Sequence, residues 1–502
     1  MQEGNRKSNR ALDYMSNKES LKQQTVSGLF WIFCQKTVGQ LISFGISVVL
    51  ARLLMPEEFG VVALAGMFTV LLGLFIDCGM GTALIQKKDA DDLDLNTMFW
   101  AQTAFSIIVY FVLFTLAPLF AKIFDTPQLT SVIRVSSILM PIGTLGGIQG
   151  VVVTRKMDFK VYFYRTLIAS VLSGIIGIYL AYSGWGVWAL VTQQLSSSII
   201  SMITVFSQVR WLPSFKFSYD RFKALFSVGI KFMTSSLIGT TFFQLRGYMI
   251  GLKYTPADLA FYNRGEGVPN IFVRNIDSTL NGVLFPVFAK LQDDRLAVKR
   301  AVRRSIQTSS YLIFPMVLGL AAIADHLVVI LYTEKWVACI PFMQVFCISE
   351  CFTILNTANM QVLRGIGEVN TLLKLELYKN PVMVTILAVT MFISPLAICI
   401  GMCIYGIYTM VINAFPNRKF IQYHLKEQLK DISENAILAI IMAVVVFLIG
   451  RLNLNLYALV AIQVFIGVLV YVGLSAFFHL ESWEYVKSNA SAYLQKLSVN
   501  RK

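Results

Sequence analysis

Eight ionisable side chains stand out inside otherwise apolar stretches of this sequence; one, Arg134, lies in the first turns of its span and needs no function, and seven are candidates for one. Four are basic and three are acidic: Lys36, Lys231, Arg246 and Arg274, then Asp77, Asp277 and Glu350. If these stretches cross a membrane, each charge costs about 2.5–3.5 kcal/mol at bilayer depth unless it has a partner or water. Lys and Arg bind anions, and the planar guanidinium of Arg matches two phosphate oxygens at once. The net-positive set therefore predicts a cavity whose four basic residues bind an anionic substrate.

The three acids admit two interpretations. Asp77, Asp277 and Glu350 could bind H+ or Na+ and couple transport to an ion gradient, or they could be counter-charges that hold the basic residues in place. Arg274 and Asp277 are three residues apart on one helix face, so they could also neutralise each other. The sequence leaves these alternatives open. It predicts no other cofactor and no metal site.

Uncharged polar residues recur at helical spacing beside several of these charges. The stripes are Lys36, Gln40, Ser43 and Ser47; Gln194, Ser197, Ser201, Thr204 and Gln208; and Glu350, Thr353, Thr357, Gln361 and Arg364. Residues at this spacing share one face of a helix. A single Ser or Thr in a membrane helix usually serves only helix packing. Whole stripes that contain a charge are more typical of a water-filled cavity, and the residues predicted to line it are Gln40, Ser43, Gln194, Ser197, Glu350 and Thr353.

The elements that must position these residues are membrane-spanning helices. The 502 residues are 56% hydrophobic and 14% charged, with a mean hydropathy of +0.65, whereas soluble chains carry about 25% charged residues. We expect an all-α, polytopic membrane protein with about 14 spans of about 20 residues each. The spans are predicted near 25–51, 60–85, 97–121, 130–153, 164–182, 187–208, 225–251, 265–289, 306–332, 338–362, 378–394, 397–415, 435–450 and 456–478. The stretch 78–86 could be loop, and the division at Ser394–Pro395 is the weakest.

The distribution of positive charge predicts the orientation. With the N-terminus inside, roughly 32 of the 43 Lys and Arg residues fall in cytoplasmic segments. Both termini are then cytoplasmic, and the net charge of +15 reflects membrane topology rather than nucleic-acid binding. The polar N-terminus has no short apolar core followed by a cleavage site, so the first span is predicted to be retained.

An internal repeat indicates two lobes. Pro56 recurs as Pro256, and Ile76–Asp77 recurs as Ile276–Asp277, both at an offset of 200 residues. Two landmarks at one spacing indicate a duplicated six-helix unit, with a cleft between two lobes that open alternately. The predicted division is a cytoplasmic segment 1–24, an N-lobe 25–222, a C-lobe 223–420, a helix pair 421–480 and a cytoplasmic tail 481–502.

Motifs of soluble enzyme chemistry are missing from the sequence. It contains no GxGxxG after a strand, no Walker loop and no HExxH. A transporter driven by an ion gradient needs none of these motifs, so the chain is predicted not to be an enzyme.

Several sequence motifs resemble those of a known family. They are Leu50–Gly60 (LARLLMPEEFG), Asp77–Ile85 (DCGMGTALI), Arg155–Phe159 (RKMDF), Gly184–Val191 (GWGVWALV), Phe261–Arg264 (FYNR) and Phe285–Phe288 (FPVF). The chain resembles the polysaccharide flippases, of the O-antigen and colanic-acid exporter type, in the multidrug/oligosaccharidyl-lipid/polysaccharide exporter superfamily. The motifs cover about 25–290. Beyond about 305 only hydropathy supports the resemblance.

The resemblance implies a substrate and a setting. It implies two six-helix lobes that carry an oligosaccharide on undecaprenyl pyrophosphate across a bacterial cytoplasmic membrane, for surface polysaccharide biosynthesis. A polysaccharide polymerase and an initiating glycosyl-phosphate transferase are the implied partners, besides membrane lipids. The alternatives are an ion-coupled exporter of small molecules or drugs from the same superfamily, a membrane enzyme such as a glycan polymerase, and a scaffold. The net-positive cavity disfavours the first, and the short predicted outside loops disfavour the second.

Overall fold

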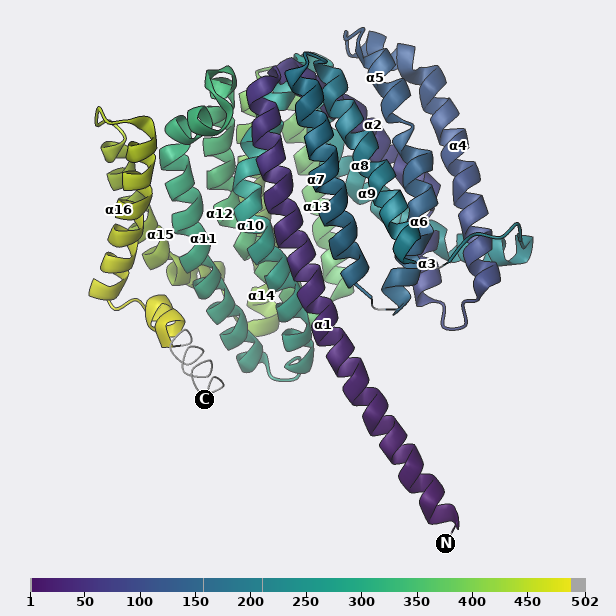
Figure 1. The fold of residues 1–502 in the computed structure, drawn as a ribbon. Coiled ribbons are helices and arrows are strands. Elements are labelled where there is room, and N and C mark those ends of the chain that lie inside the picture. The colour runs from purple at the N-terminus through teal and green to yellow at the C-terminus, as the bar shows by residue number, and fades with distance from the viewer. Residues whose placement is uncertain (1, 157, 210, 489–502) are drawn as a thin grey trace, which may run out of the picture. The chain divides into compact units, whose positions relative to one another are not determined.

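A computed structural model describes residues 2–156, 158–209 and 211–488, and they form two compact units, Met1–Leu252 and Lys253–Lys502. The first unit contains α1 (Gln2–Leu53), α2 (Pro56–Asp77), α3 (Met80–Gln86), α4 (Asp92–Ile123), α5 (Leu129–Ser136), α6 (Leu139–Lys156), α7 (Lys160–Tyr182), α8 (Val187–Gln208) and α9 (Tyr219–Lys253). The second contains α10 (Pro256–Lys290), α11 (Arg295–Tyr332), the short 3-10 helix η1 (Glu334–Cys339), α12 (Ile340–Gly365), α13 (Val369–Thr390), α14 (Pro395–Ile421), α15 (Leu425–Ile449) and α16 (Leu456–Phe477) (Figure 1). No strand occurs in the described residues.

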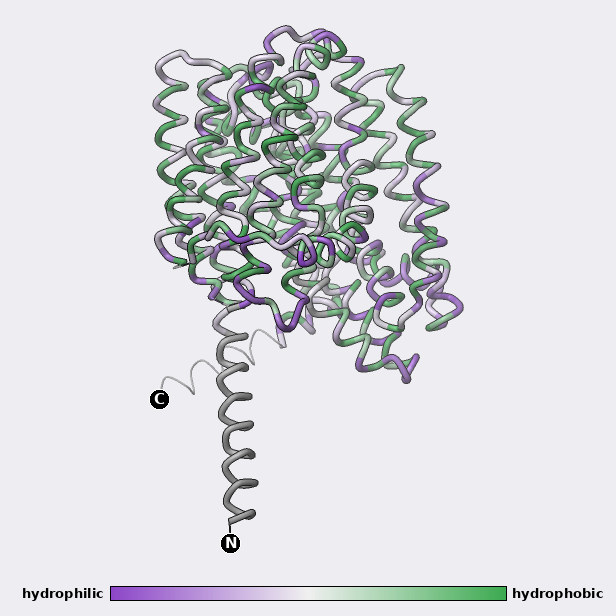
Figure 2. Tube along the Cα trace, turned by 90° about the vertical axis from the view of Figure 1, so that its right-hand side faces the viewer, coloured by the Kyte–Doolittle hydropathy of each residue, from purple (hydrophilic) through white to green (hydrophobic). Residues whose placement is uncertain are grey.

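Most of these helices have the length and composition of membrane spans. Within the described chain, twelve are long and apolar enough to cross a membrane. The other two predicted spans are also long helices, α10 and α13, but they carry more charge, such as Arg274 and Lys379. Hydrophobic residues follow the middle of the helices, and hydrophilic ones gather near the loops (Figure 2). The prediction of an all-α polytopic membrane protein is confirmed.

The repeat is visible where its helices begin. Both α2 and α10 start with proline at the first helical position, Pro56 and Pro256, where a missing N–H costs nothing. In both, the carboxylate three residues after the N-cap accepts a hydrogen bond from the N-cap N–H, at 2.8 Å for Glu58 and 3.0 Å for Asp258. The same local sequence therefore produces the same helix start in each unit.

The repeat ends where α2 ends. The helix stops at Asp77, and Cys78 and Gly79 have φ of 46° and 67° before α3 begins. A Cβ on Gly79 would lie 2.2 Å from the carbonyl oxygen of Gly229 in α9, so glycine permits this close crossing. In contrast, α10 continues through Asp277 without a break. The stretch 78–86 is thus a break followed by a short helix.

The compact units of the structure do not divide at the boundary predicted for the lobes. The compact units divide after Leu252, so all of α9 up to that residue is grouped with the first unit. The division at Ser394–Pro395 is present, because the Ser394 hydroxyl caps α14. The predicted lobe boundary at 222/223 stays a prediction, and the predicted tail 481–502 lies in part outside the described residues.

Candidate functional site

The two polar pockets of the first unit lie along one pair of helices, α1 and α7, which we call the strip. Helices α1 and α7 pack side by side (Figure 1). The Gln35 amide donates to the Thr166 hydroxyl at 3.3 Å, and further along Gly174 faces Ile46, whose side chain leaves no room for a Cβ. Residue numbers rise together on both helices, so α1 and α7 run parallel.

The first pocket carries charge and has a volume of about 560 Å³. We call it the charged pocket. Its lining comes from α1, α2, α3, α6 and α7, with one stretch of the α6 wall made of glycine: Gln35, Asp77, Gly81, Thr82, Ile85, Gly147, Gly150, Val151, Thr154, Tyr162 and Arg165. It combines one cation, one carboxylate and several neutral hydrogen-bonding groups, which is a chemistry suited to a polar, anionic ligand.

Arg165 is the cation of this pocket. Its guanidinium lies 4.9 Å from the centre of the Tyr162 ring, and it has no hydrogen bond or ion pair with any other residue in the described part of the chain. The Tyr162 hydroxyl donates to the Gly150 carbonyl at 2.7 Å and lies 3.0 Å from the Thr154 hydroxyl, which fixes the ring. The five N–H donors of Arg165 therefore remain available to a ligand.

Sequence analysis missed Arg165. The residue lies at the start of the span predicted for 164–182, where a snorkelling Arg is ordinary. The available signal was the pair Tyr162 and Arg165, three residues apart and so on one helix face.

Asp77, predicted as a possible ion-binding residue, lines the same pocket. Its Oδ1 accepts hydrogen bonds from the Gln102 amide at 2.9 Å and from the Gly81 N–H at 3.3 Å. The carboxylate thus ties the end of α2 to α3 and α4 while it still faces the pocket.

The second pocket is polar but uncharged, with a volume of about 260 Å³. We call it the neutral pocket. Its lining comes from α1, α2, α7 and α8: Ser43, Ile46, Ser47, Leu50, Phe59, Val62, Ser170, Ser173, Leu190, Gln193, Gln194 and Ser197. The structure therefore brings together Ser43, Gln194 and Ser197, which were predicted from two separate stripes. A Cβ on Gly177 would lie 2.7 Å from the Gln193 side chain, so this glycine makes room for the amide.

Four other predicted residues of the first unit lie outside the lining of both pockets. They are Lys36, Gln40, Lys231 and Arg246. Lys36 and Lys231 are exposed on α1 and α9, and the Arg246 guanidinium packs 4.7 Å from the Phe243 ring. Lys231 and Arg246 are fifteen residues apart on α9, about 22 Å along its axis, so one phosphate group cannot contact both, and their predicted role in a cavity stays a prediction.

In the second unit, the predicted charges meet between α10 and α12. The Thr357 hydroxyl donates to Asp277, while Glu350 interacts with Thr353 and lies within electrostatic reach of Arg274 and Asp277. Arg274 and Asp277 form no ion pair with each other among the described residues. Nor does that part of the chain contain three His, Cys, Asp or Glu residues grouped to hold a metal ion.

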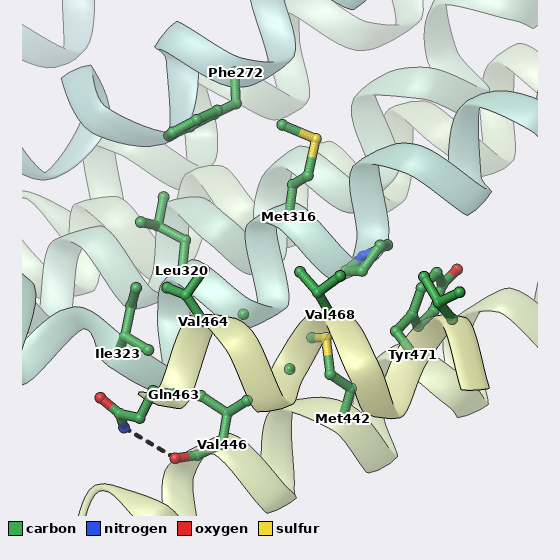
Figure 3. A pocket seen from close by; sticks show the side chains of 14 residues that line it. Phe272, Met316, Leu320, Ile323, Met442, Val446, Gln463, Val464, Val468 and Tyr471 are labelled. Carbon is green, nitrogen blue, oxygen red and sulfur yellow. Dashed lines mark hydrogen bonds between the residues drawn. The ribbon is translucent and has the colours of Figure 1, made fainter. Parts of the chain in front are cut away.

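The second unit also contains an apolar cavity of about 330 Å³ (Figure 3). It lies between α10, α11, α15 and α16, with Phe272, Met316 and Val468 in its wall. The Gln463 amide in this wall donates to the Val446 carbonyl at 2.9 Å. The lining contains no charged side chain, so this cavity does not suit a phosphate.

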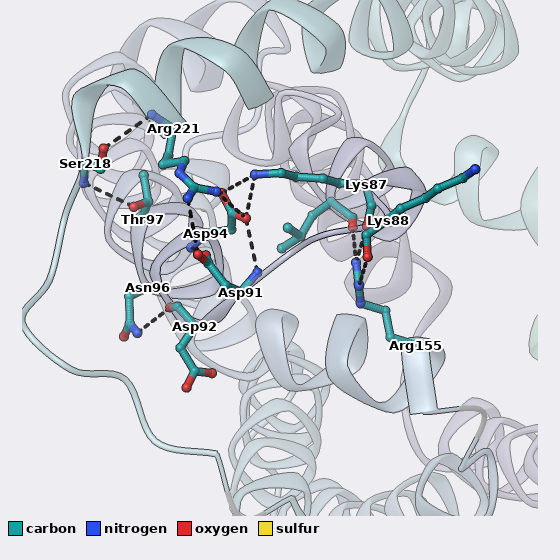
Figure 4. Close-up of polar contacts among 11 residues, drawn as sticks. Lys87, Lys88, Asp91, Asp92, Asp94, Asn96, Thr97, Arg155, Ser218 and Arg221 are labelled. Carbon is teal, nitrogen blue, oxygen red and sulfur yellow. Dashed lines mark hydrogen bonds and ion pairs between the residues drawn. The ribbon is translucent and has the colours of Figure 1, made fainter.

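An ion-pair cluster holds the ends of the helices that frame the charged pocket (Figure 4). Asp94 is fully buried and pairs with Lys87 at 2.6 Å and Arg221 at 3.1 Å, while Arg155 donates to the Lys87 carbonyl at 2.8 Å. The N–H of Asp94 donates to Asp91, and this bond, with the nearby Arg221, lowers the pKa of the Asp91 carboxyl below its usual range. The cluster joins the starts of α4 and α9 to the ends of α3 and α6.

Comparison with known proteins identifies the family. The sequence matches the model described as "Polysaccharide biosynthesis protein" over residues 49–341, more than half of the chain. The chain belongs to this family. The succinoglycan biosynthesis transport protein ExoT of Rhizobium meliloti is 28% identical over 341 residues, which cover 67% of this chain and 68% of ExoT. The lipopolysaccharide biosynthesis protein WzxC of Escherichia coli is 22% identical over 369 residues, or 72% and 74% of the two chains.

Solved structures show the fold of this family member. The lipid II flippase MurJ, in an inward closed conformation, matches with a TM-score of 0.72 at 13% identity, covering 90% of this chain and 99% of MurJ. An inward-facing MATE multidrug transporter of the MOP superfamily matches with a TM-score of 0.57 at 15% identity, covering 76% and 94%. The predicted resemblance is confirmed, and this polysaccharide biosynthesis protein is a multi-pass membrane protein of transporter type, not an enzyme.

Proposed function

We propose that this chain is a flippase for undecaprenyl-pyrophosphate-linked oligosaccharide. It moves the glycan from the cytoplasmic to the outer face of a bacterial cytoplasmic membrane, for the synthesis of a surface polysaccharide. The observation that carries the proposal is the charged pocket, where Arg165 faces polar side chains without an ion-pair partner in the described residues. A pyrophosphate and its sugars cannot cross hydrocarbon unaided, because charge and hydroxyl groups lose their water there.

The proposed mechanism is alternating access. Arg165 binds the pyrophosphate through charge-assisted hydrogen bonds, while the polyprenyl tail stays in the lipid. The protein then exposes the head group to the other side by population of a second conformation. Asp77, Asp277 and Glu350 are proposed to couple this change to H+ or Na+, since acids inside a transporter are common ion sites. Both termini are cytoplasmic in this proposal, by the positive-inside rule.

The family context suggests the partners. The printed names of the relatives ExoT and WzxC refer to succinoglycan transport and lipopolysaccharide biosynthesis. A polysaccharide polymerase would consume the flipped lipid, and an initiating glycosyl-phosphate transferase would start its synthesis. The lipid-linked oligosaccharide is thus the ligand shared by all three proteins.

The test is the sidedness of the lipid-linked glycan in cells that lack this protein. We expect the glycan lipid to accumulate on the cytoplasmic face and the wild-type gene to restore its exposure. Arg165→Gln removes charge-assisted bonds of about 1.5–3 kcal/mol, so we expect roughly 10- to 100-fold slower flipping at limiting substrate. Lys160→Gln is the matched control, because it removes one positive charge from the exposed start of the same helix.

Two results would contradict the proposal. Outward-facing glycan lipid in cells without this protein and without a redundant flippase would favour the small-molecule exporter. Equal rates for Arg165→Gln and Lys160→Gln would remove the charged pocket from the transport path.

A further inference from the structure

The neutral pocket lies beside the charged pocket on the same helix pair. Gln35 lines the charged pocket and Ser43 the neutral one, and Arg165 and Ser173 repeat this order on α7. Each step is eight residues, or about 12 Å along a helix axis. Because α1 and α7 run parallel, a ligand bound at Arg165 can extend along the strip into the neutral pocket. The separation matches the reach of a short oligosaccharide.

The neutral pocket contains many hydrogen-bonding groups that no side chain or backbone atom satisfies. The side chains of Ser43, Ser170, Gln193, Gln194 and Ser197 have no hydrogen-bond partner among the described residues. Each Gln amide offers two donors and an acceptor oxygen, and each hydroxyl offers both functions. Such groups in a membrane protein require water or a ligand, since leaving them unpaired in hydrocarbon costs several kcal/mol each.

The lining also indicates what kind of ligand fits. Neither Lys, Arg, Asp nor Glu lines this pocket, so it offers no charge to neutralise a phosphate or a cation. Hydroxyls and amides line the pocket together with the apolar Phe59, Ile46 and Leu50. A sugar ring has the matching chemistry, because its hydroxyls both donate and accept while its C–H faces are apolar.

We propose that the neutral pocket selectively binds the sugars that follow the pyrophosphate in the lipid-linked glycan. This binding determines which glycan is transported. This inference rests on the proposed flippase function and adds to it a division of roles. Arg165 binds the part common to all lipid-linked glycans, whereas Gln193 and Gln194 bind the part that differs among them. A site built to hydrogen-bond a hydroxyl rejects a ligand that lacks it far better than an apolar site does, because its own polar groups are left unpaired.

The experiment measures flipping in proteoliposomes that contain the purified full-length protein. Two substrates are compared: the full polyprenyl-pyrophosphate-linked repeat unit and the same lipid carrying only its first sugar. We expect Gln193→Leu combined with Gln194→Leu to lower the ratio of the two rates, full unit over single sugar, by about tenfold or more. Arg165→Gln lowers both rates and leaves their ratio within about twofold. Gln208→Leu is the control, since this exposed amide ends α8 outside the pocket.

The outcomes separate the two proposals. If the wild type flips neither lipid, the flippase function fails and the sugar site falls with it. If the wild type flips both and the double variant keeps the wild-type ratio, the sugar site alone is refuted. The exposed single variant Gln194→Leu covers the case in which the double variant fails to fold, and an unchanged ratio in it counts against the site in the same way.

Discussion

Replacing the buried carboxylate Asp94 should destabilise the first unit more than any neighbouring charge change. Asp94 is fully buried, and its two oxygens receive hydrogen bonds from Lys87 and Arg221. Asp94→Asn keeps the shape of the side chain but removes its charge and turns an amide toward two cations. The change therefore tests whether the ion-pair cluster holds the helix ends that frame the charged pocket.

The size of the effect follows from the contacts. A hydrogen bond to a charged group contributes about 1.5–3 kcal/mol. Lys87 and Arg221 keep side-chain exposures of 30% and 37%, so water compensates them in part and the lower figure applies to each. The sum is about 3 kcal/mol. At roughly 2–4 °C per kcal/mol for a unit of this size, the unfolding midpoint falls by about 6–12 °C.

The assay is thermal unfolding of the purified protein in mild detergent, followed by tryptophan fluorescence. Asp92→Asn is the matched control, because Asp92 is exposed and has no ion-pair partner in the described residues. It loses only the favourable effect of an acid at a helix start, about 0.3–1 kcal/mol. Equal midpoints for Asp94→Asn and Asp92→Asn would refute the reasoning, since the burial and pairing of Asp94 would then contribute nothing.

Two further predictions use the same assay. Gly79→Ala should destabilise the protein by at least about 1–2 kcal/mol, because its φ of 67° disfavours a side chain and the new Cβ meets backbone of α9. The control Gly66→Ala lies in open space within α2 and should be neutral or stabilising by up to about 1 kcal/mol. Equal effects of the two substitutions would argue against the close crossing of α9 at Gly79. Asp91→Asn keeps a capping oxygen but loses the charge. The folded protein lowers the pKa of the Asp91 carboxyl. The ionised carboxylate therefore stabilises the fold fully above the ordinary carboxyl pKa, and this stabilisation is lost as pH falls through the pKa in the folded protein. The variant should therefore be less stable than wild type at pH 7, with a gap that closes in acid; a gap that persists there would assign the effect to something other than ionisation.

Sequence patterns predicted what depends on neighbours in the chain. The recurrence of Pro56 as Pro256 was recognised from the sequence, and both prolines start helices within one turn. Hydropathy alone placed these starts too late, near 60 and 265. Ser43 and Gln194 belong to two separate stripes that were predicted to line a cavity, and in the structure both line the neutral pocket. Their role in binding stays a prediction. Helical periodicity fixes a face, and a polar face on an apolar helix must find another polar face.

What the sequence could not supply is the partner of each face. Lys231 and Arg246 were predicted from depth and charge to lie in a cavity; in the structure they lie outside the lining of both polar pockets, and their role stays a prediction. Arg165 was overlooked because depth alone places it at a span end. The packing of α1 against α7 shows that Arg165 lines a pocket together with Gln35.

The repeat shows the same limit in another form. Asp77 and Asp277 occupy equivalent positions, and both were predicted as ion-binding residues. In the structure Asp77 ends its helix and binds the Gln102 amide, whereas Asp277 lies inside a continuous helix and binds the Thr357 hydroxyl. Left-handed backbone at Cys78 and Gly79 makes the difference, and no such break follows Asp277.

A transporter of one carrier lipid with many possible glycans needs affinity and selectivity from different contacts. If the charged pocket supplied both affinity and selectivity, tighter binding of the pyrophosphate would slow the release of every glycan equally. It would not distinguish one glycan from another. Selectivity from neutral hydrogen bonds avoids this conflict, because each bond adds only about 0.5–1.5 kcal/mol, while a missing hydroxyl leaves an amide unpaired beneath the bound ligand at about 1–3 kcal/mol. In the proposed mechanism the two pockets lie about 12 Å apart along α1 and α7, so we expect substitutions at Gln193 or Gln194 to change which glycan is transported without changing the proposed contact between Arg165 and the carrier.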